Sequence, residues 1–164
     1  MDREKLLQYI APCSLLCYTC MGLKDGPIAE CARTLHDLSA GIPEFFCRNT
    51  PEDERDKQLT FFHDFRNTLQ HFSSAFCPGC RNNDAACPAY EGCVIPACVK
   101  EREIDFCAEC GYFPCDKVKD FFYARDAKIY PVWENGNRRL REIGIEAYFE
   151  EKKGVSHYTH YTEK

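Results

Sequence analysis

The sequence has no long hydrophobic run and no secretory leader pattern. Charged residues interrupt every apolar stretch well before the roughly 20 residues that a membrane-spanning helix needs, so we expect no membrane segment. The N-terminus, Met1-Asp2-Arg3-Glu4-Lys5, lacks the basic and then apolar order of a signal peptide. We therefore expect a cytoplasmic protein.

Basic charge is also scarce. Lys and Arg number 21 against 26 Asp and Glu, which gives a formal net charge of −5. An acidic surface repels phosphate backbones, so nucleic-acid binding is not expected. Basic residues gather near the C-terminus, at Arg138, Arg139, Arg141, Lys152 and Lys153. Acidic residues alternate with them at helical spacing, at Glu142, Glu146, Glu150 and Glu151, which predicts an ion-paired helix face.

Motifs of well-known reactions are missing. The chain has no Ser/His/Asp set, no phosphate-binding loop and no H-E-x-x-H motif, so no specific reaction is supported. His36, His63 and His71 fall on predicted helices, where packing or solvation is the simpler role. His157 and His160 belong to a polar tail. No alternation of strands and helices appears, which argues against a doubly wound sheet.

The pattern of the 164 residues predicts a small, mainly α single domain with little or no β structure. Residues 2–10 and 27–40 repeat apolar side chains at helical intervals. A long amphipathic helix over 51–76 starts with a Thr50 cap and Pro51 in its first position. Its apolar stripe contains Leu59, Phe62, Phe65, Leu69, Phe72 and Phe76. The last helix starts near Asn135 or Asn137.

Thirteen cysteines are the dominant feature. They lie at Cys13, Cys17, Cys20, Cys31, Cys47, Cys77, Cys80, Cys87, Cys93, Cys98, Cys107, Cys110 and Cys115. A secreted disulfide scaffold would usually show an even number and a leader, whereas cytosolic thiols more often hold metal. We therefore interpret them as metal-binding or redox thiolates, with the segment 77–115 as the main site.

Two C-x-x-C units favour zinc in that segment. The spacing at Cys77-Pro78-Gly79-Cys80 and at Cys107-Ala108-Glu109-Cys110 lets one turn direct two sulfurs to a single ion. Eight thiols can fill two tetrahedral sites, and spacing leaves the partition open. One partition joins Cys77, Cys80, Cys93 and Cys98, and leaves Cys87, Cys107, Cys110 and Cys115; the other divides the eight in sequence order.

Redox chemistry is the alternative for these thiols. A thioredoxin-type dithiol would sit between a strand and a helix, but Cys77 and Cys80 follow a predicted helix. Four thiolates also hold iron–sulfur clusters, although the bacterial ferredoxin run is absent. Zinc is the first interpretation, and an iron–sulfur or thiol-based electron carrier is the second.

The N-terminal group has the spacing C-x-x-x-C-x-x-C, at Cys13, Cys17 and Cys20. Radical enzymes that use S-adenosylmethionine share this spacing, but they need an aromatic residue where Thr19 stands and a longer barrel. We expect a third structural site instead, completed by Cys31 or Cys47. An open three-thiolate zinc would be a catalytic centre.

Taken in order, these motifs resemble those of a cysteine-rich family of uncharacterised function, the domain of unknown function DUF3795. The resemblance rests on Ala11–Cys20, with Ser14 where glycine is usual, on Cys77–Cys80 and on Cys93–Cys98, with Pro96 in place of arginine. It continues through Cys107–Cys115 and Asn137–Phe149. What it implies is a cysteine-based, zinc-binding protein without an established activity.

Together these patterns predict one domain over 1–164. It consists of an N-terminal Cys motif with helices (1–50), a long helix (51–76), a metal-clamped coil (77–115) packed on that helix, C-terminal helices (116–154) and a polar tail (155–164). The leading hypothesis is a structural zinc protein that binds a protein partner. The others are an iron–sulfur or thiol redox protein and a zinc enzyme with an open N-terminal site.

Overall fold

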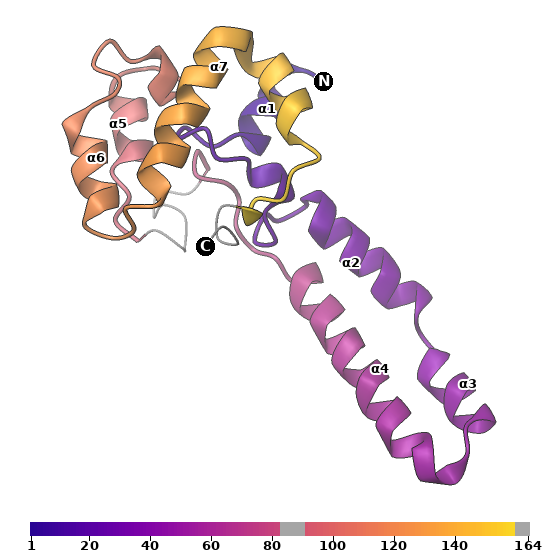
Figure 1. The fold of residues 1–164 in the computed structure, drawn as a ribbon. Helices are drawn as coiled ribbons and strands as arrows, with labels where there is room; N and C mark the ends of the chain where they lie inside the picture. The colour runs from indigo at the N-terminus through magenta and orange to yellow at the C-terminus, as the bar shows by residue number, and fades with distance from the viewer. Residues whose placement is uncertain (83–90, 160–164) are drawn as a thin grey trace. The chain divides into compact units, whose positions relative to one another are not determined.

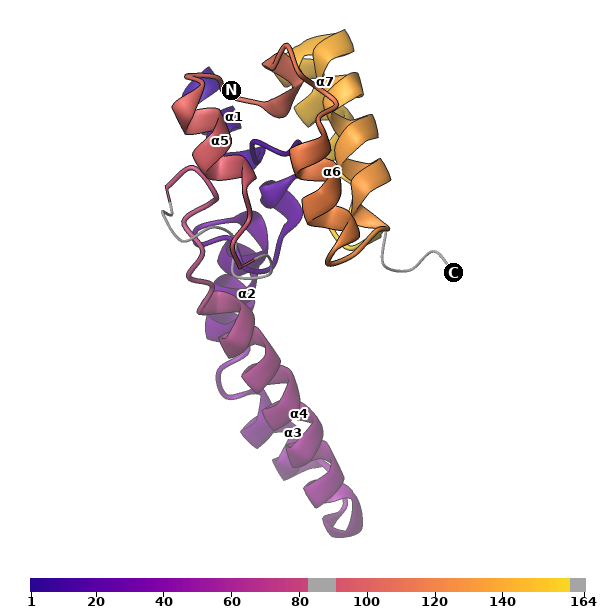
Figure 2. The same cartoon turned by 90° about the vertical axis from the view of Figure 1, so that its left-hand side faces the viewer.

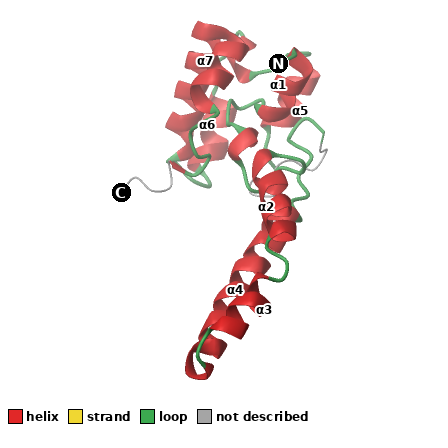
Figure 3. Cartoon of the chain, turned by 90° about the vertical axis from the view of Figure 1, so that its right-hand side faces the viewer, coloured by secondary structure: helices red, strands yellow, loops and turns green. Residues whose placement is uncertain are grey.

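The computed structural model of the chain describes residues 1–82 and 91–159 (Figure 1). Over these two ranges the backbone forms seven α-helices and two short 3-10 helices, with no β-strand (Figure 3). The predicted mainly helical fold is therefore confirmed. None of the described helices is both long enough and apolar enough to cross a membrane.

The chain divides into two compact units. One contains Met1–Cys20 and Cys77–Lys164, and the other contains Met21–Phe76. The N-terminal Cys motif thus folds with the later thiols and the C-terminal helices, although the whole of the second unit separates them in sequence. The assignment of residues 1–164 to one domain stays a prediction.

The unit Met21–Phe76 consists of three helices, α2 (Pro27–Leu38), α3 (Ile42–Asn49) and α4 (Glu52–Ser73). Both α2 and α3 pack against α4 (Figure 1). The helices predicted at 27–40 and 51–76 are confirmed, whereas α3 was not predicted. Between α2 and α3, Gly41 takes a positive φ of 79°, which only glycine adopts at little cost.

The start of α4 differs by one residue from the prediction. Pro51 precedes the helix as its N-cap, so Glu52 takes the first helical position. The Thr50 hydroxyl donates to the Phe46 carbonyl oxygen at 2.7 Å, at the end of α3, and does not cap α4. The hydroxyl therefore satisfies the C-terminus of one helix where the sequence suggested the N-terminus of the next.

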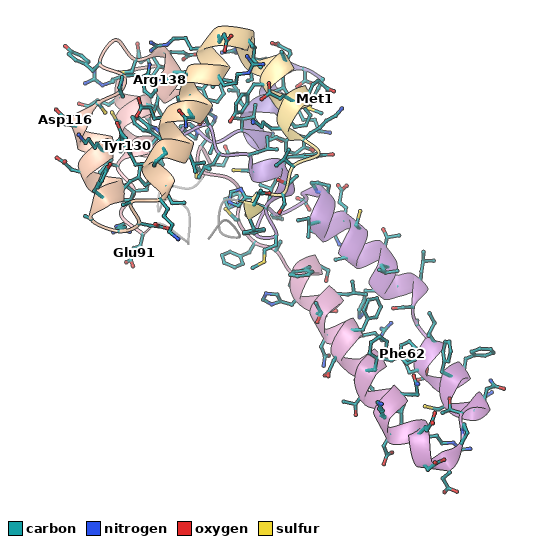
Figure 4. The ribbon with its side chains drawn as sticks, in the orientation of Figure 1. Met1, Phe62, Glu91, Asp116, Tyr130 and Arg138 are labelled. Atoms are coloured by element: carbon teal, nitrogen blue, oxygen red, sulfur yellow. The ribbon has the colours of Figure 1, made fainter. Side chains whose placement is uncertain are left out.

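The apolar stripe of α4 faces helices of its own unit. Leu69 is buried, and the Phe62 ring lies 5.1 Å from the Phe46 ring of α3 (Figure 4). Phe65 and Phe76 are 36% and 74% exposed. Within this unit α4 packs against α2 and α3, and the packing of the thiol-rich segment on this helix stays a prediction.

The other unit contains α1 (Arg3–Tyr9), α5 (Ile95–Glu101), α6 (Asp116–Tyr123) and α7 (Ile129–Lys152), with 3-10 helices η1 (Cys17–Thr19) and η2 (Cys107–Glu109). Helix α7 packs against α1, α6 and η2 (Figure 2). Helix α1 confirms the helix predicted at 2–10, and its Asp2 carboxylate accepts a 2.8 Å hydrogen bond from the Lys5 backbone N–H.

Helix α7 begins at Ile129, six residues before the first start that the sequence suggested. Its first turn contains Pro131, which is tolerated there because the first turn has no intrahelical acceptor for an N–H. Ile129 and Trp133 are fully buried, and this burial extends the helix towards its N-terminus. Gly144 has a φ of 80°, and it kinks the helix near its middle.

The exposed face of α7 has the ion pairs that the sequence predicted. Arg138 lies 2.6 Å from Glu134, and Arg139 lies 2.8 Å from Glu151. Exposed pairs of this kind contribute little to stability. Lys152 and Lys153 pair with Glu151 and Glu150 in the same way, so four of the five basic residues near the C-terminus are ion-paired.

Two clusters of buried residues form the core of this unit. The first joins α1, η2 and the C-terminal half of α7, through Leu6, Ile10, Leu16, Phe106, Ala108, Leu140, Ile145, Tyr148 and Phe149. The second contains two cysteines among its apolar side chains, and its members are Ala11, Cys13, Ile95, Val99, Cys107, Val118, Phe122, Ile129 and Trp133. Helix α5 lies in the segment predicted to be coil. It joins this cluster through Ile95 and Val99.

Candidate metal centres: two groups of cysteine thiols

Four cysteines line one pocket together with the indole ring of Trp133, and we call this group the Trp133 site. Its thiols belong to Cys98, Cys107, Cys110 and Cys115. They are placed by α5, by the two ends of the η2 turn and by the residue that caps α6. The group matches the second half of the partition in sequence order, one of the two that spacing left open.

A tight turn orients the second C-x-x-C unit in this site. The Cys110 backbone N–H donates to the Cys107 carbonyl oxygen at 3.1 Å. The Glu109 carboxylate accepts from the backbone N–H groups of Asp105, at 2.7 Å, and Phe106, at 3.3 Å. Both cysteines therefore lie on a turn that is fixed from within.

Arg141 holds the same turn from α7. Its guanidinium donates to the carbonyl oxygens of Ala108, at 2.6 Å, and Cys110, at 3.2 Å. The guanidinium also lies 5.1 Å from the centre of the Phe113 ring, within the range of a cation–π contact. The sequence placed Arg141 on an ion-paired surface, but the structure gives it a supporting role at the Trp133 site.

The Trp133 indole is the apolar wall of the site. Its ring lies 5.0 Å from Phe113 and 5.5 Å from Tyr130, which Figure 4 labels on α7. The buried Nε1–H makes no hydrogen bond of normal geometry with a described residue. Burial raises the pKa of Cys107 to about 12, and the neighbouring Trp133 N–H opposes that rise because it favours the thiolate. A buried N–H beside a sulfur stabilises the thiolate form of that sulfur more than the neutral thiol.

Arg102 supplies the positive charge of the Trp133 site. Its guanidinium contacts Cys98, and this contact, followed by the proximity of Cys110, raises the pKa of Arg102. The same guanidinium lies 4.9 Å from the centre of the Tyr112 ring. The Arg102 guanidinium thus lies close to two of the four sulfurs, those of Cys98 and Cys110.

The thiols are grouped but do not form a ligand shell. Across residues 1–82 and 91–159, no three His, Cys, Asp or Glu side chains are arranged so that they could hold a metal ion. With a pKa of about 12, Cys107 is protonated near neutral pH, whereas metal ligation requires the thiolate form. Four sulfurs, the Arg102 guanidinium and the Trp133 indole nevertheless line the same pocket.

A second group of thiols packs against the apolar core on the side of Cys13, and we call it the Cys13 group. Cys13 is part of the core cluster, while Cys17, Cys80 and Cys93 are half-buried against it. Burial raises the pKa of Cys13 well above its ordinary value, and the nearby thiols of Cys93 and Cys17 add to the rise. The N-terminal motif therefore shares an apolar cluster with Cys80 and Cys93, while its completion by Cys31 or Cys47 stays a prediction.

Asn137 connects the Trp133 site and the Cys13 group through four hydrogen bonds. This fully buried amide accepts from the Ala108 N–H at 2.9 Å, inside the η2 turn of the Trp133 site. It donates to the Cys13 carbonyl oxygen at 3.0 Å, to the Ser14 hydroxyl at 3.1 Å and to the Trp133 carbonyl oxygen at 2.9 Å. One side chain of α7 thus fixes a residue beside a cysteine of each group.

The close approach of Ser14 to α7 requires glycine at position 136. A Cβ at Gly136 would overlap the Ser14 hydroxyl oxygen and lie 3.1 Å from the Tyr148 hydroxyl oxygen. We expect Gly136→Ala to lower the free energy of unfolding by about 1–3 kcal/mol, as overpacked core sites do. Urea unfolding measures this change. The control is Gly154→Ala, where a Cβ meets nothing within 4 Å, and equal stability of the two variants would contradict the prediction.

The remaining predicted cysteines are found elsewhere. Cys20 Sγ lies 3.5 Å from the Tyr158 hydroxyl, and Cys77 is half-buried in the same unit. Cys31 is exposed on α2 and Cys47 is half-buried on α3, both in the other unit. Cys87 lies outside the described residues.

The first part of the predicted polar tail docks on the N-terminal motif. His157 Nδ1 lies 2.9 Å from the Leu16 carbonyl oxygen, and burial lowers the pKa of His157. The Thr19 hydroxyl donates to the Val155 carbonyl oxygen at 3.0 Å. The segment is therefore partly structural. His160 lies beyond the described residues.

Comparison with known proteins gives a family but no function. The family model described as "Protein of unknown function (DUF3795)" matches residues 9–120, more than half of the chain. The match includes every cysteine but ends before Trp133 and Asn137 of α7. No curated protein and no solved structure matches the chain.

Proposed function

The chain belongs to the DUF3795 family, and we propose that it is a zinc-binding protein whose metal mainly stabilises the fold. The observation that carries the proposal is the convergence of Cys98, Cys107, Cys110 and Cys115 on the Trp133 pocket. Four thiolates satisfy the tetrahedral preference of Zn²⁺ and leave no open position, which is typical of structural and not of catalytic zinc.

The surroundings of the four sulfurs support a charged centre. A zinc ion with four thiolates carries a net charge of about −2, and outer donors normally compensate such charge. Arg102 contacts Cys98, and the Trp133 N–H is buried beside Cys107 without another partner among the described residues. Both donors would hold their thiolates in place and favour the deprotonated form.

The local sequence gives the metal a structural task. Between Cys93 and Cys115 the described chain has one short helix, α5, and one 3-10 turn, so little backbone is fixed by regular structure. Zinc would join α5, the η2 turn and the start of α6 at one point. Staggered rotamers give each cysteine side chain the freedom to turn its sulfur towards the ion. Binding free energy at such a site becomes folding free energy.

A structural metal leaves recognition to the protein surface. We propose a protein partner as the ligand class, and the cytoplasm as the compartment, since thiol ligands persist where the environment is reducing. The redox alternative requires an iron–sulfur cluster, which absorbs visible light, or reversible thiol oxidation.

Metal analysis of protein purified without oxygen tests the proposal. We expect zinc at a ratio of about one or more ions per chain and no visible absorption. Cys107→Ser should lose the zinc of the Trp133 site and unfold at a lower urea concentration, because a structural site contributes directly to stability. Cys31→Ser, which removes an exposed thiol on α2, should retain all of its zinc.

Two results would overturn the proposal. One is protein without zinc under these conditions, and the other is iron together with a visible charge-transfer band. The second result would support the redox alternative.

A further inference from the structure

The unit Met21–Phe76 exposes a group of large apolar side chains. Of the twelve exposed large hydrophobic side chains within residues 1–82 and 91–159, eight belong to this unit, although it is the smaller of the two. Single exposed apolar residues are ordinary, but such a concentration marks an interaction surface. Five of the eight are 36% to 64% exposed, and we call them the phenylalanine face: Leu35, Phe45, Phe46, Phe61 and Phe65.

Ring contacts make the phenylalanine face continuous from α3 to α4. The centre of the Phe46 ring lies 5.7 Å from that of Phe45 and 5.1 Å from that of Phe62. The Phe61 ring lies 5.3 Å from the same Phe62 ring. Phe65 follows Phe61 by four residues on α4, so the two side chains are neighbours along the helix.

Leu35 joins the same side of the unit from α2. Helices α2 and α4 run in opposite directions (Figure 1). Arg66 of α4 donates to the His36 carbonyl oxygen of α2 at 2.7 Å and lies 3.1 Å from its ring Nε2, so these two half-buried residues lie at the same level. Leu35 and Phe65 each come one residue earlier, a rotation of about 100°. In antiparallel helices this rotation directs both side chains to the same side.

The other side of the unit is polar. Arg33 of α2 and His63 and Gln70 of α4 are exposed, and each is rotated in the opposite sense to Leu35 and Phe65. The unit is therefore amphipathic as a whole, with one apolar and one polar side.

The core of this unit is too small to stabilise it alone. Besides Pro43, its buried apolar side chains are those of two leucines and two alanines. A unit of this size usually needs a metal, a disulfide or association to supply the remaining free energy. Its two cysteines, Cys31 and Cys47, are free thiols outside the proposed zinc site. Association is the source that its exposed apolar side fits.

We propose that the phenylalanine face is the surface through which two copies of this chain form a dimer. Its four phenylalanines together expose about two whole side chains, or roughly 400 Å². With Leu35, this approaches the apolar share of the roughly 800 Å² that each partner contributes to a stable interface. A second copy is a partner of the protein class proposed above, and the inference does not depend on the metal.

The chemistry of the face favours an identical partner. A two-fold interface brings each patch against its own copy, so a charge near the centre would meet a like charge. All five side chains of the phenylalanine face are uncharged, and two copies can meet there without such repulsion. Recognition of a different protein usually relies on charged or hydrogen-bonding groups, whereas homodimer interfaces are more apolar.

The mass of the full chain in solution tests the dimer. Sedimentation equilibrium with a thiol reductant present should give twice the monomer mass of 19.0 kDa at about 50 µM, since interfaces of this size bind at micromolar concentrations or below. Phe61→Glu should raise the dissociation constant at least about thirtyfold, because it puts a charge into the face of both copies. The reductant keeps the exposed Cys31 thiol from linking two copies.

His63→Glu is the matched control. It adds a charge to α4 two residues later, on the polar side, and should remain dimeric. A monomer of the unaltered protein would overturn the proposal, whatever else covers the face. Equal effects of Phe61→Glu and His63→Glu on the dissociation constant would also overturn it. Circular dichroism and the zinc content should be the same in both variants, and protein without zinc would contradict the proposed function but not the dimer.

Discussion

Asn137→Ala is expected to lower the free energy of unfolding by about 3–5 kcal/mol, the largest stability loss that we predict for a single side chain that is not a cysteine. The side chain is fully buried, and both its amide oxygen and its amide nitrogen are hydrogen-bonded. Alanine would leave the Ala108 N–H and the Cys13 carbonyl oxygen buried without this partner. Each unsatisfied group costs about 1–3 kcal/mol.

The same substitution should also weaken metal binding at the Trp133 site. Asn137 fixes Ala108, which follows Cys107, and Cys13 with its neighbour Ser14. Ser14 has a positive φ of 69°, a conformation that a serine keeps only when its surroundings hold it. Without the amide this turn can relax to a commoner conformation and move Cys13. Through Ala108 the loss of the amide also loosens the η2 turn, so we expect the zinc of the Trp133 site to be released at a lower chelator concentration.

Urea unfolding of the zinc-loaded protein and competition with a chelator provide the two measurements. Asn135→Ala is the matched control, because Asn135 is exposed on the same helix two residues earlier. It should lie within about 0.5 kcal/mol of the unaltered protein, as surface substitutions do. A similarly small effect of Asn137→Ala on stability would contradict the prediction, and loss of stability with unchanged chelator resistance would restrict Asn137 to a packing role.

The helices were predictable where their signal is local. For α1, α2 and α4, apolar side chains recur every three or four residues, and that period survives any tertiary arrangement. Helix α5 has only Ile95 and Val99 to mark a buried face, a pattern too short to distinguish from coil among turns and cysteines. Its existence depends on the core that it completes.

Asn137 shows why the site itself was harder to predict. Asparagine commonly caps helices, so the sequence suggested a helix start at this residue or at Asn135. Its partners Cys13 and Ala108 are 124 and 29 residues away, and no local pattern contains them. The resemblance did include Asn137, but without a structural reason. Asn137 therefore lies inside α7 and does not cap it, and its side chain makes long-range hydrogen bonds to residues beside the cysteines.

The cysteine spacing could not predict which thiols lie together. Spacing shows which sulfurs one turn can bring together, as at Cys107 and Cys110, but it does not show which turns meet. The last four thiols meet because α5, η2 and α6 pack around Trp133, the only tryptophan of the chain. Cys13 and Cys17 share an apolar cluster with Cys80 and Cys93. The whole unit Met21–Phe76 lies between the two pairs in the sequence, so spacing could not reveal this grouping.

Zinc binding at the Trp133 site should depend steeply on pH. The pKa of Cys107 is raised to about 12, so the zinc-free thiol is protonated at neutral pH, and zinc must displace that proton. Lowering the pH favours the protonated thiol, so the affinity for zinc falls as the pH falls. Each displaced proton changes the affinity by about tenfold per pH unit, and four thiols together by about ten-thousandfold.

Competition with a chelator of known pH dependence, between about pH 6 and about pH 8, measures this slope. A slope close to four protons per ion would confirm a closed four-thiolate site, because each thiol that binds zinc gives up its proton. A slope of one or less would contradict it, since a site built from water, carboxylate or neutral imidazole releases few protons in this range. Above about pH 9, where an ordinary cysteine is already ionised, Cys107 should still release one proton, because burial beside Trp133 keeps its thiol protonated.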